Sequence, residues 1–219
     1  MAAMVRVGLS GRVATVTMDR PDVHNAFNAE LIAELTAALA RAGADPEVRA
    51  VVLAAEGKSF SAGADLNWMR AMAAFGEAEN QADALKLADL MRTLAYLPKP
   101  TIARIQGSAF GGGVGLIACC DVALASDEAK FGLTESKLGL VPAVISPYVV
   151  AAIGARHARR WFQSGALFDA PRALAMNLVH EIMPADALDG AVERELDAML
   201  KAGPTAMLVA KRLVEGIFG

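Results

Sequence analysis

A run of three glycines, Gly111-Gly112-Gly113, is the sequence feature that most constrains the fold of this chain. Residues 101–106 before it are β-branched and mostly apolar, and an apolar run of small residues continues after it to Cys120. This order predicts a buried strand, a tight glycine turn and a buried helix. Glycines let a ligand approach the backbone, and the free N–H groups of the first helical turn point toward it. A carbonyl oxygen that gains negative charge would suit that position.

The glycine run is also compatible with close helix packing and with binding of a nucleotide phosphate. Glycines also let a helix pack closely against a sheet, and the run by itself does not separate this role from ligand binding. Nucleotide phosphate binding is the weaker interpretation. Leu116 stands where a G-x-G-x-x-G fingerprint counted from Gly111 needs its last glycine, and the chain has no G-x-x-x-x-G-K-[ST] motif.

Hydrophobic periodicity predicts alternating strands and helices through the first two thirds of the chain. A hairpin is expected at 5–10 and 13–19, buried strands at 50–56, 101–106 and 121–126, and helices after the cap Asn28 and around Leu87–Leu94. Beyond Ala155 the pattern becomes helical, with segments at 157–163, 171–176, 186–201 and 204–217. The chain is therefore expected to form an α/β layered domain followed by helices.

Five separated blocks resemble the crotonase, or enoyl-CoA hydratase/isomerase, family. They are Arg20-Pro21 with His24-Asn25-Ala26, SFSAGADLNWM at 59–69, PKPTIARIQGSAFGGGVG at 98–115, CDVALAS at 120–126 and FGLTESKLGLVP at 131–142. The segments RPDVHNAF, GADLNWM and GLVPAVISPYVV are most similar to bacterial methylglutaconyl-CoA hydratase-type members. The resemblance implies a spiral of ββα turns over residues 1–155. A C-terminal helical region over 156–219 is expected to be shorter than in typical members.

The resemblance also implies a site and its chemistry. Crotonases bind an acyl-CoA thioester and polarise its carbonyl with two backbone N–H groups, which here match Ala64 and Gly112, while the retained catalytic glutamate matches Glu135. Substrate-binding positions are expected at Ala62, Gly63, Asp65, Leu66, His24, Gly111 and Gly115, with Asp65 also shaping its turn. No cofactor is expected apart from the coenzyme A of the substrate. A homotrimer or a hexamer of two trimers and a cytoplasmic location are the expected assembly and compartment.

Each of these segments also has a purely structural interpretation. SAGAD by itself is typical of a strand-to-helix turn that Asp65 caps. Thr134-Glu135 by itself is more typical of a helix cap followed by a first-turn acid. Beside an apolar acyl pocket, however, burial would raise the pKa of Glu135, which suits a group that gains and loses a proton near neutral pH.

Gly115 marks a departure from the two-glutamate hydratases, which carry their second glutamate at this position. Those enzymes use the pair to hold water and move its protons. An enoyl-CoA hydratase that holds water with another group is one interpretation, and His24, Asn25 and Tyr148 are its candidates. A Δ3–Δ2 enoyl-CoA isomerase is the alternative, since moving one proton between C2 and C4 needs one carboxylate.

Other function classes fit the sequence less well. The 21 basic and 24 acidic residues give a net charge of −3, which does not favour nucleic-acid binding. An RNA-binding crotonase is disfavoured because helix 77–96 offers only Lys86 and Arg92 against Glu77, Glu79, Asp83 and Asp89. No G-x-S-x-G elbow suggests a serine hydrolase, and the histidines and cysteines lack the spacing of metal ligands.

The cysteines, the first residues and the longest uncharged segment bear on the compartment of the protein. Cys119 and Cys120 are adjacent in an apolar run and resemble core residues more than a disulfide pair, which favours a reducing compartment. The first residues contain no long apolar stretch typical of a secretory signal. Residues 138–155 carry no charge, but Pro142, Pro147 and Gly154 interrupt them. A wall of the acyl pocket or a subunit contact is expected there, and no membrane span.

Overall fold

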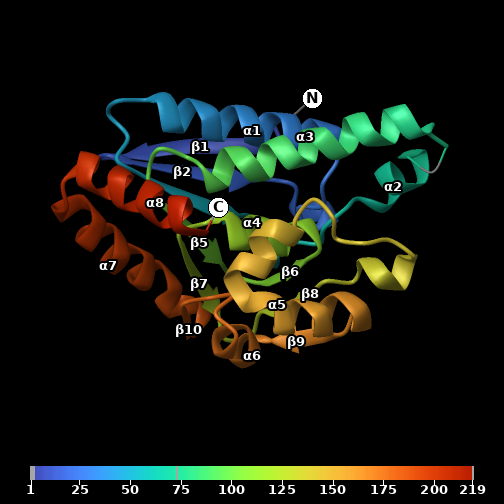
Figure 1. The fold of residues 1–219 in the computed structure, drawn as a ribbon. Helices are drawn as coiled ribbons and strands as arrows, with labels where there is room; N and C mark the ends of the chain where they lie inside the picture. Colours follow the sequence, from blue (N-terminus) through green and yellow to red (C-terminus); the bar gives the residue numbers. More distant parts are fainter. Residues whose placement is uncertain (1–2, 73, 219) are drawn as a thin grey trace.

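The computed structural model describes residues 3–72 and 74–218, which form two β-sheets surrounded by helices (Figure 1). The larger sheet has six strands in the order β1-β2-β3-β5-β7-β10. Its strands are β1 (Val5–Ser10), β2 (Val13–Met18), β3 (Ala50–Ala55), β5 (Thr101–Ile105), β7 (Val122–Ser126) and β10 (Glu181–Met183). The β1–β2 pair is antiparallel and every other pair in this sheet is parallel. The expected hairpin and the three expected buried strands are confirmed.

The smaller sheet has four strands in the order β4-β6-β8-β9. They are β4 (Ser59–Ser61), β6 (Ser108–Phe110), β8 (Lys130–Gly132) and β9 (Leu167–Asp169). Residue patterns alone did not predict these strands, because three residues are too few to display an alternation of buried and exposed side chains. As a result, the strand expected to lead directly into the glycine turn is followed by a second strand, β6.

The chain repeats one unit along its length: a strand of the larger sheet, a strand of the smaller sheet, then a helix. After β3 and β4 come α2 (Leu66–Met72) and α3 (Glu77–Ala95). After β5 and β6 comes α4 (Gly112–Cys119), and after β7 and β8 comes α5 (Ser146–Ser164). This arrangement confirms the spiral of ββα turns. It also brings the loops that follow β4, β6 and β8 to the same end of the smaller sheet, because these three strands are parallel.

Helices cover both faces of the larger sheet, which explains why β3 is buried along its whole length. Val51 and Leu53 belong to the main core together with residues of α1 (Ala29–Ala44), whereas Val52 belongs to a second core with residues of α7 (Leu188–Lys201). The Leu31 N–H donates to the Asn28 side chain at 2.8 Å, so the expected cap of α1 is confirmed. Helices α1 and α3 lie side by side (Figure 1).

The last part of the described chain is largely helical, as expected, with α6 (Ala170–Ala175), α7 and α8 (Pro204–Phe218) after α5. Helix α5 begins earlier than the sequence pattern suggested, because Pro147 lies in its first turn, where proline is tolerated. The boundary expected after Ala155 therefore falls inside α5, beside the interruption at Gly154 (φ 75°). Within the described residues, no helix is long and apolar enough to cross a membrane.

Candidate active site

One cavity of about 500 Å³ lies where the loops after β4, β6 and β8 meet α3. This volume is typical of a small-molecule site. The lining residues are Phe27, Ala62, Gly63, Ala64, Leu66, Trp68, Met69, Asp83, Ala84, Leu87, Gly111, Gly112, Thr134, Glu135, Leu138 and 140–145. Most are apolar, and Asp83 and Glu135 are the only ones among them that carry an acidic or basic side chain.

The turn after β4 places the backbone N–H of Ala64 at the cavity. The Phe27 N–H donates to Gly63 O at 2.7 Å, and the Asp65 N–H donates to Phe27 O at 2.9 Å. These two bonds form a parallel β-bridge between Phe27 and Ala64. The N–H of Ala64 itself takes no part in the bridge, and this N–H has no hydrogen-bond acceptor among the described residues. Gly63 adopts φ 83°, and a Cβ there would lie 2.9 Å from Phe110 O. The turn after β4 therefore packs directly against the turn after β6, which only glycine permits.

The turn after β6 places a second backbone N–H at the same cavity. The Gly111 N–H donates to Gly132 O at 2.9 Å, and Gly111 adopts φ 50° as the N-cap of α4. Gly112 opens the helix, and among the described residues its N–H donates no hydrogen bond to the protein. A Cβ on Gly112 would lie 2.4 Å from Cε2 of Phe27, so the aromatic ring packs against the bare Cα. Unpaired N–H groups at a helix N-terminus attract negative charge.

Glu135 begins a short 3₁₀ helix, Glu135–Leu138, in the loop after β8. Its carboxylate lies against the glycine turn, because a Cβ on Gly111 would be 3.2 Å from Oε1 of Glu135. Oε2 is buried and has no hydrogen-bond partner in the described part of the protein. Burial raises the pKa of Glu135, although a hydrogen bond with its own backbone acts in the opposite direction. A carboxyl group in this environment is suited to exchanging a proton with a bound molecule.

Asp65 stabilises the turn after β4 and does not line the cavity. Its Oδ1 accepts from the Asn67 N–H at 2.8 Å, and its Oδ2 accepts from Arg20 Nη2 at 3.2 Å. Burial acts to raise the pKa of Asp65, but the backbone N–H groups of Asn67 and Trp68 and the Arg20 guanidinium outweigh it, so the pKa is lowered. The capping role expected for Asp65 is thus observed, while direct contact with a ligand in the cavity is not supported. Leu66 lines the cavity and is largely exposed.

The three residues suggested as holders of water do not line this cavity. His24 Nδ1 lies 3.1 Å from Ser59 Oγ, and His24 O accepts from the Ala62 N–H at 2.9 Å, so this histidine supports the turn from outside. Asn25 is buried, and its amide donates to Glu56 O and Ser59 O. Tyr148 lies on α5, where burial raises its pKa. No contact with this cavity supports these three suggestions: the side chains of His24 and Asn25 bond to Ser59 and Glu56, and Tyr148 is not among the lining residues.

Gly115 lies inside α4 and does not line the cavity either, so the expectation that it contacts substrate is not supported. A Cβ at this position would lie 2.3 Å from Cγ2 and 2.9 Å from Cβ of Ile145. Ile145 itself lines the cavity and occupies the space that a longer side chain at position 115 would need. In this chain Ile145 therefore leaves no room for a glutamate side chain at position 115 unless Ile145 itself moves.

Asp83 also lines the cavity, although the sequence patterns did not predict a role for it there. Asp83 belongs to α3, is buried and accepts a hydrogen bond from Lys86 Nζ at 2.8 Å. Its position was recognisable in principle, because Asp83 shares one helical face with Leu87, Leu90 and Leu94. A carboxylate in an otherwise apolar helical stripe indicates either a buried ion pair or a functional group.

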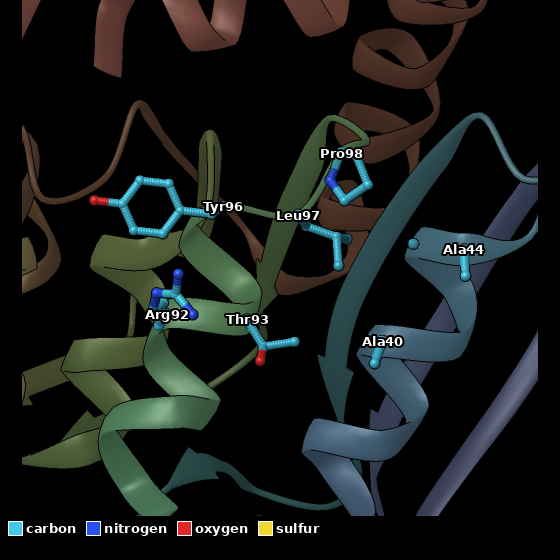
Figure 2. A pocket seen from close by; sticks show the side chains of 8 residues that line it. Ala40, Ala44, Arg92, Thr93, Tyr96, Leu97 and Pro98 are labelled. Carbon is cyan, nitrogen blue, oxygen red and sulfur yellow. The ribbon is translucent and has the colours of Figure 1, made fainter. Parts of the chain in front are cut away.

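A second hollow of about 400 Å³ lies between the ends of α1 and α3 and shares no lining residue with the cavity (Figure 2). Figure 2 shows its lining side chains: Ala40 and Ala44 belong to α1, Arg92 and Thr93 belong to α3, and Tyr96, Leu97 and Pro98 follow α3. The described residues that line this hollow include no carboxylate, so it is a weaker candidate for a catalytic site than the cavity. In the described residues, no group of three His, Cys, Asp or Glu side chains is placed to hold a metal ion.

Comparisons with known proteins agree with this geometry. The family model described as enoyl-CoA hydratase/isomerase matches residues 8–216. A Thermus thermophilus protein described provisionally as an enoyl-CoA hydratase is 36% identical over 209 residues, which cover 95% of this chain and 83% of the relative. The crystal structure of an enoyl-CoA hydratase from Shewanella pealeana matches with a TM-score of 0.96 and 45% identity, over 98% of this chain and 80% of that one. A Legionella pneumophila crystal structure described provisionally as an enoyl-CoA hydratase/isomerase (crotonase) matches with a TM-score of 0.95 and 46% identity, over 99% of this chain and 84% of that one.

Proposed function

Because the chain belongs to the enoyl-CoA hydratase/isomerase (crotonase) family, we propose that it is an enoyl-CoA hydratase that adds water to an α,β-unsaturated acyl-CoA thioester. The observation that carries this proposal is the arrangement around Gly111. Ala64 and Gly112 line the same cavity, their N–H groups have no acceptor among the described residues, and the Glu135 carboxylate lies against Gly111.

The two N–H groups stabilise the thioester oxygen as it becomes an enolate oxygen. Both belong to the main chain, and the turns that hold them pack against each other, so they are oriented before the substrate binds. One such donor is worth roughly 3 kcal/mol of barrier in other enzymes, and the stabilisation grows as charge develops on the oxygen. Substrate and enolate are therefore bound unequally, which is the requirement for catalysis.

Glu135 transfers the proton at the carbon next to the carbonyl. When water adds to C3, the π electrons of the double bond move into the enolate, and protonated Glu135 then donates its proton to C2. Burial raises the pKa of Glu135 and so increases the fraction of the group that carries this proton near neutral pH. In the reverse direction the same carboxylate removes the proton from C2.

The substrate is held by two parts of the cavity wall. The turn of Ala62, Gly63, Ala64 and Leu66 receives the thioester and the adjoining part of coenzyme A, while Asp65 keeps the turn in shape and His24 supports it. The apolar residues 138–145 surround the acyl chain, consistent with the pocket wall expected from their composition. Coenzyme A enters as part of the substrate, and no separate cofactor takes part. A branched acyl group of the methylglutaconyl type is the substrate suggested by the sequence blocks that contain GADLNWM and GLVPAVISPYVV.

The proposed assembly is a homotrimer or a hexamer of two trimers in the cytoplasm. An exposed apolar stripe on α8 supports an assembly, because a subunit contact would remove it from water. Its members are Val209, Leu213, Val214 and Ile217.

A Δ3–Δ2 enoyl-CoA isomerase is the second candidate. It is favoured by Gly115, which leaves the helix α4 without the second glutamate of typical hydratases, and by the position of Glu135 beside the oxyanion site. Isomerisation needs one carboxylate to remove a proton from C2 and return it at C4.

Steady-state assays of the purified chain distinguish these activities. Crotonyl-CoA, 3-methylglutaconyl-CoA and a 3-enoyl-CoA are offered in turn, while loss or gain of the conjugated enoyl absorbance is followed. We expect hydration of at least one 2-enoyl substrate. Glu135→Gln should lower kcat about 100- to 10,000-fold, because the proton carrier is lost while the volume is kept. Glu128→Gln, at an exposed position, is the matched control. A Glu135→Gln enzyme that retains more than a tenth of wild-type turnover would contradict the proposed mechanism.

A further inference from the structure

Hydration by this chain requires a group that receives a proton from water, and Glu135 is already assigned to the proton at C2. Asp83 supplies the only other carboxylate among the described residues that line the cavity. It reaches the cavity from α3, whereas Glu135 reaches it from the loop after β8, so the two carboxylates approach a bound acyl chain from different elements. We propose that Asp83 is a second catalytic residue, which binds the attacking water and accepts its proton; this inference rests on the proposed hydratase function.

The environment of Asp83 leaves one oxygen available for this role. Oδ1 accepts from Lys86 Nζ at 2.8 Å, one helical turn away on the exposed side of α3. Oδ2 accepts no hydrogen bond within the described residues, and it is not among the buried polar atoms that lack a partner. Oδ2 is therefore not fully enclosed by protein, and Asp83 lines the cavity, so this oxygen is the one free to bind a water molecule there. The carboxylate is otherwise well enclosed, because its side chain is 11% exposed, while the Lys86 side chain is 60% exposed.

A buried carboxylate on an apolar helical face is costly unless it forms specific contacts. The remaining inward positions of this face are Leu87, Leu90, Met91 and Leu94, which pack in the main core or beside it. A leucine at position 83 would extend this stripe without an ion pair. Instead the chain holds a charged pair at the point where the stripe leaves the core and reaches the cavity. This contrast favours a chemical role for Asp83 over a packing role.

In the hydration step, Asp83 and Glu135 each transfer one proton. Oδ2 of Asp83 accepts a proton from water as the water oxygen forms a bond to C3. The π electrons of the C2–C3 bond move toward C1, and the negative charge collects on the thioester oxygen between the N–H groups of Ala64 and Gly112. Glu135 then donates its proton to C2, which completes the addition. Asp83 ends protonated and Glu135 ends ionised, and exchange of one proton with bulk water restores both.

This assignment also explains how the chain dispenses with a glutamate at position 115. Ile145 fills the space beside Gly115, so a carboxylate cannot enter from α4. A carboxylate from α3 reaches the same cavity from another wall. In this proposal the second acid/base group comes from α3 and not from α4, while Ala64, Gly112 and Glu135 keep the positions typical of the family.

The test compares Asp83→Asn with Asp89→Asn, since Asp89 lies on the exposed side of the same helix. Hydration of the best 2-enoyl substrate and exchange of the C2 proton of a saturated acyl-CoA with deuterium oxide are measured for both variants. Asp83→Asn should lower kcat for hydration at least 100-fold and change the exchange rate less than about three-fold, because exchange needs only Glu135. Asp89→Asn should change neither rate.

Further variants separate catalysis from structure. Lys86→Met removes the ion pair and keeps Asp83, so it should retain most of the hydration rate, whereas a purely structural ion pair would make Lys86→Met and Asp83→Asn equally defective in both assays. If the kcat of Asp83→Asn for hydration lies within ten-fold of the wild-type value, the role of Asp83 is overturned and the hydratase proposal stands. A wild-type chain that exchanges the C2 proton but hydrates none of the substrates overturns both.

Discussion

Among single residues, Glu135 and Gly112 each have a structural role and a proposed chemical role. Glu135 starts a 3₁₀ helix, as its sequence context suggests, and also places a carboxylate beside the glycine turn. Gly112 leaves room for the ring of Phe27 and also presents an unpaired N–H to the cavity. The two roles are separable by experiment because they act on different observables, stability and turnover.

Burial of Glu135 predicts a characteristic dependence of stability on pH. The folded state raises the pKa of this group, so it binds the proton more tightly than the unfolded chain does. Its contribution to stability is fully present below the unfolded pKa of about 4.3 and is lost as pH rises through the higher folded value. Glu135→Gln should therefore unfold at the same temperature as wild type in acid and at a higher temperature near neutral pH. Equal melting temperatures at both pH values would show that the carboxylate is well solvated. Glu128→Gln should match wild type throughout.

Adding one methyl group at Gly112 should damage both fold and site. A Cβ there would lie 2.4 Å from Cε2 of Phe27, and relieving such overlap typically costs about 1–3 kcal/mol. Gly112→Ala should lower the midpoint of urea unfolding and the hydration rate together. Gly190→Ala is the control, because a Cβ in that part of α7 meets nothing within 4 Å, and it should raise stability by roughly 0.5–1 kcal/mol. A Gly112→Ala chain as stable as wild type would show that Phe27 moves freely.

At the scale of elements, the site is built where loops and helix ends meet, while strands and helix interiors form the core. The loops after β4, β6 and β8 carry Ala64, Gly112 and Glu135, and α3 adds Asp83. Helix α8 makes a polar contact with the residues around the larger sheet: Lys211 Nζ lies 3.0 Å from Asp121 Oδ2, and this oxygen also accepts from the N–H and Oγ1 of Thr101.

This contact predicts that α8 is fastened to the larger sheet mainly through Lys211. The Lys211 side chain is 11% exposed, and hydrogen bonds to charged groups typically contribute roughly 1.5–3 kcal/mol. Lys211→Met should lower the free energy of unfolding by about this amount and make α8 more susceptible to proteolysis, without abolishing turnover. Lys201→Met, at an exposed position in the last turn of α7, is the matched change. Equal proteolysis of both variants would show that apolar contacts alone hold α8.

At the scale of the whole molecule, the cavity is enclosed by segments that lie far apart in the sequence. Phe27, the turn after β4, α3, the glycine turn and residues 138–145 all contribute to its wall. Several of the lining side chains are largely exposed, among them Leu66, Leu138, Leu140 and Val141. Ligand binding would therefore cover apolar surface contributed by most of the ββα spiral.

Binding of an acyl-CoA should accordingly stabilise the fold. A ligand at 100 times its Kd adds about 2.7 kcal/mol to the free energy of unfolding, provided that it binds only the folded state. Saturating crotonyl-CoA should raise the melting temperature of Glu135→Gln, which keeps the cavity but turns over the substrate slowly. Thermal unfolding with free coenzyme A serves as the comparison, and it should give a smaller shift because the acyl pocket stays empty. No shift with either compound would place the ligand site elsewhere.

Local sequence was sufficient to predict the hairpin, the buried strands, the cap at Asn28 and the glycine turn, because each depends on residues close together in the chain. The similarity of five blocks to the crotonases further predicted the spiral fold and the residues Ala64, Gly112 and Glu135 as site positions. The structure brings these three residues to one cavity. Their catalytic roles remain predictions.

The remaining features were decided by tertiary packing. Gly115 is inaccessible because Ile145, from another element, occupies the adjacent space. His24, Asn25 and Asp65 have polar side chains typical of a site, yet hydrogen bonds to Ser59, Glu56 and Arg20 direct them into the framework. Asp83 was counted only as part of a charge balance, although the packing of α3 turns it into the cavity. Side chains from separate turns of the spiral meet only after folding, so local sequence determines which elements form, and packing between those elements determines which polar groups face a ligand.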